Sequence, residues 1–241
     1  MELSLKDIIQ GSDNIVFFGG AGVSTESGIP DFRSATGLYN QKHQTDFSVE
    51  EMLSHGYFIR HTEEFYEYYK NHLLFPEAGP NAAHHALAKL ERMGKLKAVI
   101  TQNVDNLHQA AGSKTVLELH GSAYRNYCMD CGEHYGLEEI LKKTGVPHCE
   151  KCGGIIRPDV VLYGENLETS VVQRALQAIS RAETLIIGGT SLVVYPAAGF
   201  VEYFRGKHLV LINQDKTSQD GRATLVIREK IGKVLAEAVD L

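Results

Sequence analysis

Four cysteines form two Cys-x-x-Cys pairs, Cys128 with Cys131 and Cys149 with Cys152. Two such pairs allow two tight turns to present four thiolates tetrahedrally to one Zn²⁺ ion. Glycines follow both pairs closely, which suits turns in which backbone amides approach the sulfur atoms. Buried free cysteines and a redox pair are the alternatives. Because a site with four thiolates has no open coordination position, the spacing predicts a structural zinc ion, not a catalytic one.

A glycine-rich segment, residues 19–25, follows the apolar run of residues 15–18. Glycines at such a place let the backbone approach a pyrophosphate, and amides at a helix start bind it. The usual dinucleotide fingerprint is incomplete, because Thr25 stands where the third glycine is expected and no clear acidic residue follows about 20 positions later. The segment predicts an unusual phosphate-binding loop, with a simple tight turn as the alternative. It disfavours a standard hydride-transfer dehydrogenase.

Amide and carboxylate side chains cluster in residues 101–108, directly after the apolar run of residues 97–100. In open α/β sheets, ligands bind beyond the carboxyl ends of the strands. Polar side chains there cost desolvation free energy unless they bind something. Asn103 and Asp105 suit a ligand with an amide group and ribose hydroxyls, whereas capping of a helix by either residue is the alternative.

His120 ends another apolar run and is followed by Gly121, which leaves space beside the ring. A histidine at the end of a strand is well placed to act as a general base. The alternative is a histidine that packs in the core or lies on the surface. The residue types alone make His120 a candidate for catalysis and do not decide its role.

The elements that must position these residues alternate along the chain. Four runs rich in Val, Ile and Leu lie at residues 15–18, 97–101, 184–189 and 207–213. They do not alternate between apolar and polar residues, which is typical of central strands in a covered parallel sheet. Helical patterns lie at residues 82–93 and 170–182. This alternation predicts an α/β fold with a doubly wound parallel sheet.

Two segments interrupt the alternation. Residues 34–76 are dense in Tyr, Phe, His and Glu and have a helical pattern, and residues 128–152 are rich in turns and hold every cysteine. Both are predicted to belong to a second, smaller domain inserted in the sheet domain.

The composition is that of an ordinary globular protein, with 43% hydrophobic and 22% charged residues. A net charge of −6 gives no electrostatic reason to expect nucleic-acid binding. No stretch approaches the roughly 20 apolar residues that span a bilayer, and the first residues lack the pattern of a secretory signal. We therefore expect a cytoplasmic protein without a membrane or nucleic-acid partner, in which disulfides are disfavoured.

Together these segments resemble the sirtuin family. The stretches that carry the resemblance are GAGVSTESGIPDFR at 20–33, TQNVDNLH at 101–108, LHG at 119–121, the four cysteines, VLYGEN at 161–166, GTSLVVYPAA at 189–198 and the Ile-Asn pair at 212–213. They run in the family's order, and several are nearly unique to it. The chain has about the length of the bare catalytic core of bacterial and archaeal members.

The resemblance implies a Rossmann-like NAD-binding domain formed by residues 1–38, 77–122 and 157–241. It also implies a small domain formed by a helical module, residues 39–76, and a zinc ribbon, residues 123–156. The implied NAD contacts are Gly20, Ala21, Gly22, Thr25, Phe32, Arg33, Gln102, Asn103, Asp105, Gly189, Thr190, Ser191, Asn213, Gln214 and Ile227. Val161, Gly164 and Glu165 would pair with the backbone of an acyl-lysine peptide as an added strand.

The implied activity is NAD-dependent lysine deacetylation or deacylation of proteins. The acyl group passes to ADP-ribose, which gives nicotinamide, free lysine and 2′-O-acyl-ADP-ribose. His120 would act as the general base, while Asn103 and Asp105 would position the nicotinamide carboxamide. NAD-dependent ADP-ribosylation of proteins is the alternative reaction for the same pocket. A nucleic-acid-binding zinc ribbon is disfavoured, because acidic and basic residues nearly balance in residues 124–156.

The acyl preference is predicted from one helix. Sirtuins that prefer succinyl or malonyl lysine carry a Tyr and, three residues later, an Arg that together bind a carboxylate. Tyr66 matches the first position, but Tyr69 stands where Arg would be. Tyr57 and Arg60 have the right spacing, but this pair lies nine residues earlier and lacks the preceding aromatic residue, and Lys70 is one position off. We therefore expect Tyr66 and Tyr69 at a pocket for short neutral acyl groups, with simple packing of the tyrosines as the alternative.

Overall fold

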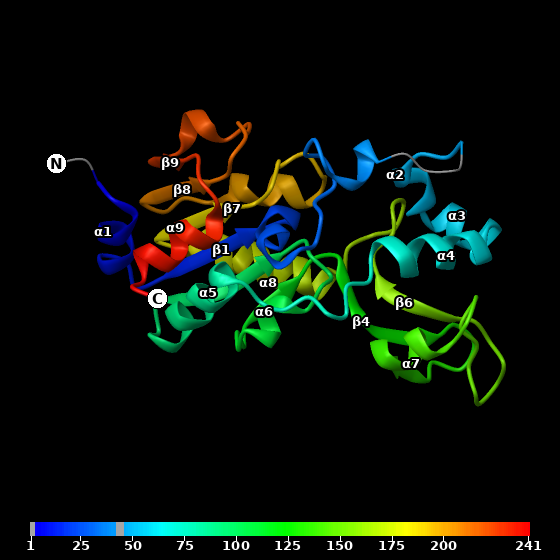
Figure 1. Ribbon diagram of the computed structural model, residues 1–241. Coiled ribbons are helices and arrows are strands. Elements are labelled where there is room, and N and C mark those ends of the chain that lie inside the picture. The colour runs from blue at the N-terminus through cyan, green and yellow to red at the C-terminus, as the bar shows by residue number, and fades with distance from the viewer. Residues whose placement is uncertain (1–2, 42–45) are drawn as a thin grey trace.

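The computed structural model describes residues 3–41 and 46–241. Figure 1 shows a larger part built on a parallel sheet and a smaller part that contains the remaining strands and several helices. Helix α1 (Leu5–Gln10) and the C-terminus lie at the end of the larger part that is remote from the smaller part. Within the described residues, no helix combines the length and apolar character that a bilayer crossing requires.

The larger sheet has six strands in the order β3-β2-β1-β7-β8-β9, and every neighbouring pair is parallel. The strands are β1 (Ile15–Gly19), β2 (Leu96–Thr101), β3 (Val116–Glu118), β7 (Thr184–Gly188), β8 (His208–Ile212) and β9 (Leu225–Ile227). The chain moves outward from β1 to β3, returns to the centre, and moves outward again from β7 to β9. The predicted α/β fold with a doubly wound sheet is confirmed.

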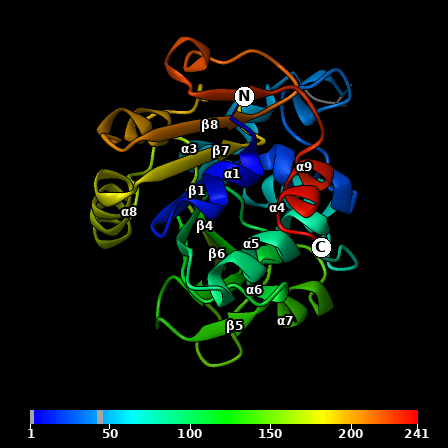
Figure 2. The same ribbon diagram turned by 90° about the vertical axis from the view of Figure 1, so that its left-hand side faces the viewer.

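Alternate side chains of each strand supply the two hydrophobic cores. Ile15 and Phe17 pack in one core with helices α1, α5 (Ala82–Arg92) and α9 (Ile231–Ala238). Val16 and Phe18 pack in the other core with α8 (Thr169–Arg181) and the 3₁₀ helix η4 (Ala197–Tyr203). Figure 2 shows α8 on one side of the strands and α5 and α9 on the other. Burial on both faces explains why these strands are apolar throughout.

The smaller part combines the two segments that interrupt the alternation. Its sheet has the antiparallel order β5-β4-β6, formed by β4 (Gly121–Cys128), β5 (His134–Gly136) and β6 (Ile156–Val160), with α7 (Leu137–Lys142) after β5. The helices α2 (Val49–Met52), α3 (His55–Arg60) and α4 (Thr62–His72) complete it. Their buried aromatic side chains share one hydrophobic cluster with Ala123, Leu137 and Leu162. Residues 42–45 of the predicted helical module lie outside the described residues.

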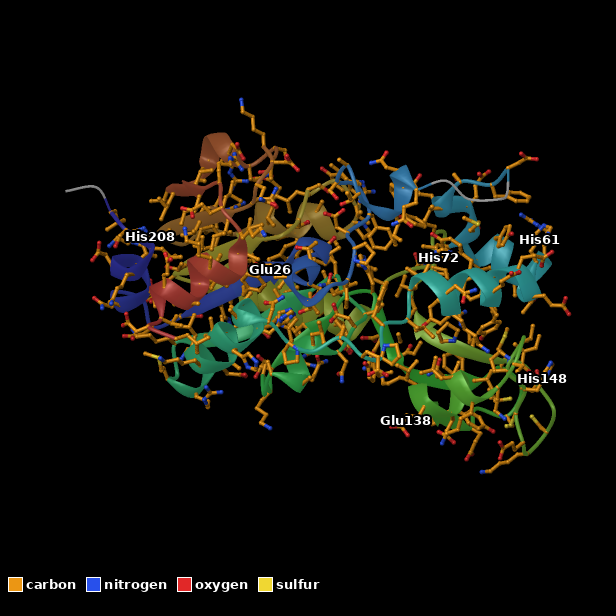
Figure 3. All side chains as sticks on the ribbon, in the orientation of Figure 1. Glu26, His61, His72, Glu138, His148 and His208 are labelled. Carbon is orange, nitrogen blue, oxygen red and sulfur yellow. The ribbon has the colours of Figure 1, made fainter. Side chains whose placement is uncertain are left out.

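A single carboxylate ties the loop after β1 to the C-terminal helix. Glu26, in the 3₁₀ helix η2 (Thr25–Ser27), accepts a hydrogen bond of 2.7 Å from the backbone N–H of Gly232. Figure 3 labels Glu26 beside the ribbon of α9. A Cβ atom at position 232 would lie only 2.7 Å from the Glu26 carboxylate, so glycine is needed for this approach. The first turn of α9 thus positions the glycine-rich loop.

Two buried histidines lie side by side between α5 and α6 (Leu107–Ala110). The ring centroids of His84 and His108 are 4.7 Å apart in a T-shaped arrangement, and Phe17 packs on His108. Neither ring nitrogen of His108 has a hydrogen-bond partner among the described residues. Burial lowers the pKa of His84 to about 4 and that of His108 to about 3, because the charged rings would lose hydration. Both rings are therefore neutral at pH 7.

This histidine pair predicts that acid destabilises the fold. The unfolded chain protonates both rings near pH 6.5, whereas the folded chain does so only near pH 4 and pH 3. Between these values the unfolded chain binds more protons, so the contribution to stability is complete above pH 6.5 and is lost as the pH falls. In urea titrations, we expect the equilibrium constant for unfolding to rise as the pH is lowered. The rise should be up to about tenfold for each pH unit and each histidine.

His108→Phe should make the free energy of unfolding less dependent on pH between 4 and 6.5. His134→Phe is the matched control, because His134 is an exposed histidine of β5 in the smaller part. Equal pH dependence of unfolding in the two variants would contradict the role given to the buried pair.

Candidate active site

A cleft opens where the two halves of the larger sheet meet. Strands β1 and β7 are neighbours, but the chain leaves them toward opposite edges of the sheet. Loops that follow such a pair of strands diverge and leave a crevice at their carboxyl ends. The cleft there has a volume of about 360 Å³, and residues of the smaller part, among them Leu53, Tyr69 and Leu137, form its other wall.

Most residues that the sequence predicts for the site line this one cleft. They are Gly20, Ala21, Gly22, Phe32, Arg33, Tyr69, Gln102, Asn103, Asp105, His120, Val161, Gly164, Glu165, Gly189, Thr190, Ser191 and Asn213. Apart from Tyr69 of α4, they come from loops that follow β1, β2, β3, β6, β7 and β8, so the fold brings together segments that lie far apart in the chain.

Four predicted residues lie outside the cleft lining. The Thr25 hydroxyl donates to the carbonyl of Gly22, at 3.0 Å, and the Tyr66 hydroxyl donates to the carbonyl of Ile156 inside the smaller part. Gln214 does not line the cleft, and Ile227 ends β9, where its carbonyl accepts from the N–H of Asn213. The binding roles expected for these four residues stay predictions.

The glycines of the phosphate loop are explained by contact between two loops. The N–H of Gly22 donates to the carbonyl of Gly189 at 2.8 Å. A Cβ atom at position 22 would lie 2.8 Å from the Gly189 Cα, and one at position 20 would lie 2.9 Å from the Thr190 Cβ. Gly189 itself has a φ of +58°, which favours glycine. Only glycines allow the loops after β1 and β7 to meet backbone to backbone at the bottom of the cleft.

Ser24 links the two polar residues of the loop after β2. The Asn103 side-chain amide donates to the Ser24 hydroxyl at 3.1 Å, and that hydroxyl donates to the Asp105 carboxylate at 2.5 Å. The second oxygen of the same carboxylate accepts from the N–H of Leu107, the first residue of α6, at 3.0 Å. The N-cap position of α6 is Asn106, which makes no side-chain cap hydrogen bond, so neither Asn103 nor Asp105 is the helix cap. Burial raises the pKa of Asp105, and its hydrogen bonds oppose this rise.

His120 presents one defined nitrogen as a proton acceptor. Its Nδ1 lies 3.0 Å from the carbonyl oxygen of Gln102, which can only accept, so Nδ1 carries the proton and Nε2 carries the lone pair. Burial lowers the pKa of His120, although the hydrogen bond to Gln102 opposes this effect. The neutral ring is thus the form present at pH 7. A Cβ atom at Gly121, where φ is +75°, would overlap the carbonyl of Asp159, which explains the neighbouring glycine.

Residues 161–165 form the wall of the cleft opposite the phosphate loop. The N–H of Val161 donates to the carbonyl of His120 at 3.0 Å, which fixes the start of this segment beside the catalytic candidate. The Glu165 carboxylate accepts two hydrogen bonds from the buried Arg157 guanidinium, at 2.9 and 3.0 Å. His55 Nδ1 also lies 2.8 Å from it. Glu165 therefore anchors the segment from within, although it was predicted as a substrate contact.

Several lining residues are absent from the sequence prediction. They include Ser24, Tyr124, Tyr163, Tyr195 and Asp215, together with apolar residues of the smaller part. Ser24, Tyr163 and Tyr195 lie inside the recognised motifs, so their place in those motifs was an available signal. Tyr124 follows the Leu-His-Gly motif without any local feature that separates it from a strand residue.

The four cysteines form a set of ligands that fits zinc. Their sulfur atoms all lie within 4.8 Å of one another, with 3.4 Å between Cys128 and Cys152 and 3.6 Å between Cys131 and Cys149. Tetrahedral zinc with bonds of about 2.3 Å requires sulfur separations of about 3.8 Å. The Tyr135 hydroxyl also donates to the Cys149 sulfur at 3.1 Å, as expected around a thiolate. The site lies in the smaller part and shares no residue with the cleft lining.

Residues 20–196 match the model of the Sir2 family. This chain belongs to the Sir2 family. It is 62% identical to a Clostridium perfringens protein named NAD-dependent protein deacetylase. The alignment spans 237 residues, which are 98% of this chain and 97% of the relative. A Clostridium acetobutylicum protein of the same name is 58% identical over 236 residues, which cover 98% and 96% of the two chains.

Solved structures of Sir2 proteins share the fold. One, with a deacetylated p53 peptide and 3′-O-acetyl ADP-ribose, has a TM-score of 0.87 and 40% identity and covers 96% of each chain. Another, Sir2Tm bound to a propionylated peptide, has a TM-score of 0.85 and 40% identity, and the match covers 97% of this chain and 95% of the other. The sirtuin assignment made from the motifs is confirmed.

The cysteine site predicts one zinc ion per chain with a structural role. Cys131→Ser should reduce the bound zinc below one per chain and lower the Tm, because metal binding contributes directly to folding free energy. Elemental analysis of freshly purified protein and thermal unfolding measure the two effects. Met129→Ser is the matched control, since Met129 is an exposed residue of the same turn. Zinc-free wild-type protein, or an unchanged Cys131→Ser variant, would refute the site.

Proposed function

We propose that this Sir2 protein is an NAD-dependent protein lysine deacylase. It transfers an acyl group from lysine to ADP-ribose and releases nicotinamide, free lysine and 2′-O-acyl-ADP-ribose. The observation that carries the proposal is the convergence of His120, Asn103 and Asp105 on the cleft at the switch point of a doubly wound sheet, where dinucleotides bind. The clostridial relatives, named as NAD-dependent protein deacetylases over nearly their full length, support the same activity.

The loops after β1, β7 and β8 would hold NAD. The meeting point of Gly22 and Gly189 brings backbone close to the pyrophosphate, and Asn213 lies where the adenosine would be bound, with the predicted contacts Gln214 and Ile227 beside it. When bound, NAD supplies an electrophilic ribose carbon, C1′, that accepts the acyl oxygen as nicotinamide departs. Asn103 and Asp105 would hold the carboxamide, and Ser24 orients both side chains in advance.

His120 is proposed as the general base. Its Nε2 lone pair would take a proton from a ribose hydroxyl, and the Gln102 carbonyl would then stabilise the charged ring through Nδ1. Because burial keeps the free ring neutral, the base is ready at the pH of the cytoplasm, where we expect the protein to act.

An acyl-lysine peptide or protein would lie along the wall formed by residues 161–165. Val161 and Gly164 would offer backbone groups for an added strand. The acyl group would reach the apolar side of the cleft, where Leu53, Tyr69 and Leu162 are lining residues and Tyr66 packs behind Tyr69. The solved relatives that hold a p53 peptide and a propionylated peptide support this class of substrate.

The two parts of the fold would act as two domains with the boundaries predicted from the sequence. Residues 1–38, 77–122 and 157–241 would bind NAD, and the module of residues 39–76 with the ribbon of residues 123–156 would complete the substrate wall. Zinc would hold the ribbon together and take no part in the chemistry, because its four ligands lie outside the cleft.

His120→Ala should lower deacetylation by about 10²–10⁴-fold, the usual effect of removing a general base. Binding of NAD should change little, because the His120 ring is not one of the residues expected to hold the dinucleotide. Mass spectrometry of 2′-O-acetyl-ADP-ribose measures the reaction and distinguishes it from ADP-ribosylation of protein. His85→Ala, on the exposed side of α5, is the control. More than about a third of normal activity in His120→Ala would reject the assignment.

Short neutral acyl groups should be preferred over succinyl. Arg33 is the only Lys or Arg among the residues found to line the cleft, and it already lies 3.7 Å from Glu50. The Lys70 ammonium donates to the carbonyls of Lys143 and Gly145, at 2.5 and 2.8 Å, and so is directed into the smaller part. A succinyl carboxylate would therefore be buried without a cation.

The measurement is kcat/KM for acetyl-lysine and succinyl-lysine forms of one peptide. We expect the acetyl form to be favoured by at least about tenfold, since an unpaired carboxylate loses hydration in the cleft. A succinyl value equal to or above the acetyl value would reject this preference.

A further inference from the structure

Two tyrosines join two segments that contribute residues to the cleft lining. The hydroxyls of Tyr39 and Tyr163 are 2.7 Å apart, within hydrogen-bond distance, although the residues are 124 positions apart in the chain. Tyr39 belongs to the 3₁₀ helix η3 (Leu38–Asn40), at the end of the loop that follows the phosphate segment. Tyr163 is the middle residue of the 161–165 wall. The contact therefore lies between the loop of residues 31–40, which carries expected NAD contacts, and the wall of residues 161–165, where we expect the peptide to bind.

Tyr39 holds the cofactor side of the cleft in place. Its N–H donates to the carbonyl of Phe32 at 2.9 Å, and its ring meets the Phe32 ring edge to face with 5.5 Å between centroids. The Arg33 guanidinium lies 4.9 Å from the centroid of the same ring. Phe32 and Arg33 both line the cleft. A movement of the Tyr39 ring would therefore move two residues proposed to contact NAD.

Tyr163 is held by its own backbone. Its N–H donates to the carbonyl of Leu53 and its carbonyl accepts from the N–H of His55, each at 3.0 Å. The turn around it is closed by Glu165, which accepts from the N–H of Leu162 at 2.9 Å and forms the bidentate ion pair with Arg157. The Tyr163 hydroxyl is thus a fixed point to which the loop of residues 31–40 can attach.

Tyr39 enters this hydrogen bond as a neutral phenol. Burial, and then the bond to Tyr163, raise the pKa of Tyr39, so its side chain stays uncharged at physiological pH. Tyr163 is 38% exposed, so water competes for its hydroxyl. A hydrogen bond of this kind contributes a factor of about two to ten to an equilibrium constant.

We infer that the Tyr39–Tyr163 hydrogen bond couples the binding of NAD to the binding of the acyl-lysine peptide. Tyr39 acts as a positioning residue, because it holds Phe32 and Arg33 and does not itself contact reacting atoms. A peptide on the 161–165 wall would displace the water that competes for the exposed Tyr163 hydroxyl, and so strengthen its hydrogen bond to Tyr39 and the hold of Tyr39 on Phe32 and Arg33. By linkage, NAD must favour peptide binding by the same factor. This inference rests on the proposed function.

The test is a double-mutant cycle with Tyr39→Phe, Tyr163→Phe and the double variant. Phenylalanine keeps both rings and removes only the hydroxyls. ADP-ribose replaces NAD, because it lacks nicotinamide and cannot react. Calorimetry gives its Kd with and without a saturating acetyl-lysine peptide, and the ratio of the two Kd values measures the coupling. Tyr203→Phe is the matched control, since Tyr203 is an exposed tyrosine outside the cleft lining.

Each single variant should lower the coupling ratio by about two- to tenfold, and the double variant should lower it no further. Tyr203→Phe should retain the wild-type ratio. A wild-type ratio in either single variant, or additive effects in the double variant, would overturn the inference. Deacetylation by the wild-type protein is measured in parallel: its absence would reject the proposed function, whereas an active enzyme without coupling would reject the inference alone.

Discussion

The backbone contact between the loops after β1 and β7 is the constraint on which the site depends. Gly22 and Gly189 meet with a hydrogen bond of 2.8 Å, and a Cβ atom on either residue would clash with the other loop. This contact closes the bottom of the crevice that the doubly wound sheet leaves open. If the loops stood further apart, the residues on them would face a wider opening, and the polar residues after β2 would lose their partners.

The polar network is built on that contact. Ser24 lies just beyond Gly22, and its hydroxyl reaches both Asn103 and Asp105, which follow the adjacent strand β2. Gln102 joins the same region to the loop after β7, because its side chain donates to the Thr190 hydroxyl at 3.1 Å, while its carbonyl sets the tautomer of His120. Each of these side chains is oriented before any ligand binds, which is how a site avoids reorganisation during the reaction.

The smaller part contributes a wall and its rigidity. The helices share one hydrophobic cluster with Ala123 of β4 and Leu137 of α7, whereas Cys128 and Cys149 pack in a second cluster of the same sheet. The ion pair between Arg157 and Glu165 fixes the wall segment to β6, and the guanidinium lies 5.5 Å from the Phe58 ring centroid in α3. The substrate wall is therefore connected to both halves of the smaller part, and Tyr39 connects it to the end of the loop that follows β1.

The sequence by itself determined the fold class and the candidate zinc ligands, because these depend on residue types and short spacings. Most of the lining residues were expected from the resemblance of several motifs to the sirtuin family. Unbroken apolar runs indicate buried parallel strands, and two Cys-x-x-Cys pairs need only local turns to form a metal site. The three-residue strand β9 is too short to stand out in this way. The tertiary structure decided where side chains point. It turned Glu165 toward Arg157, directed Lys70 toward the loop after α7, buried His108 against His84 and brought Tyr39 to Tyr163. These contacts join residues distant in the chain, so they follow from the packing of complete elements and have no signature in local sequence.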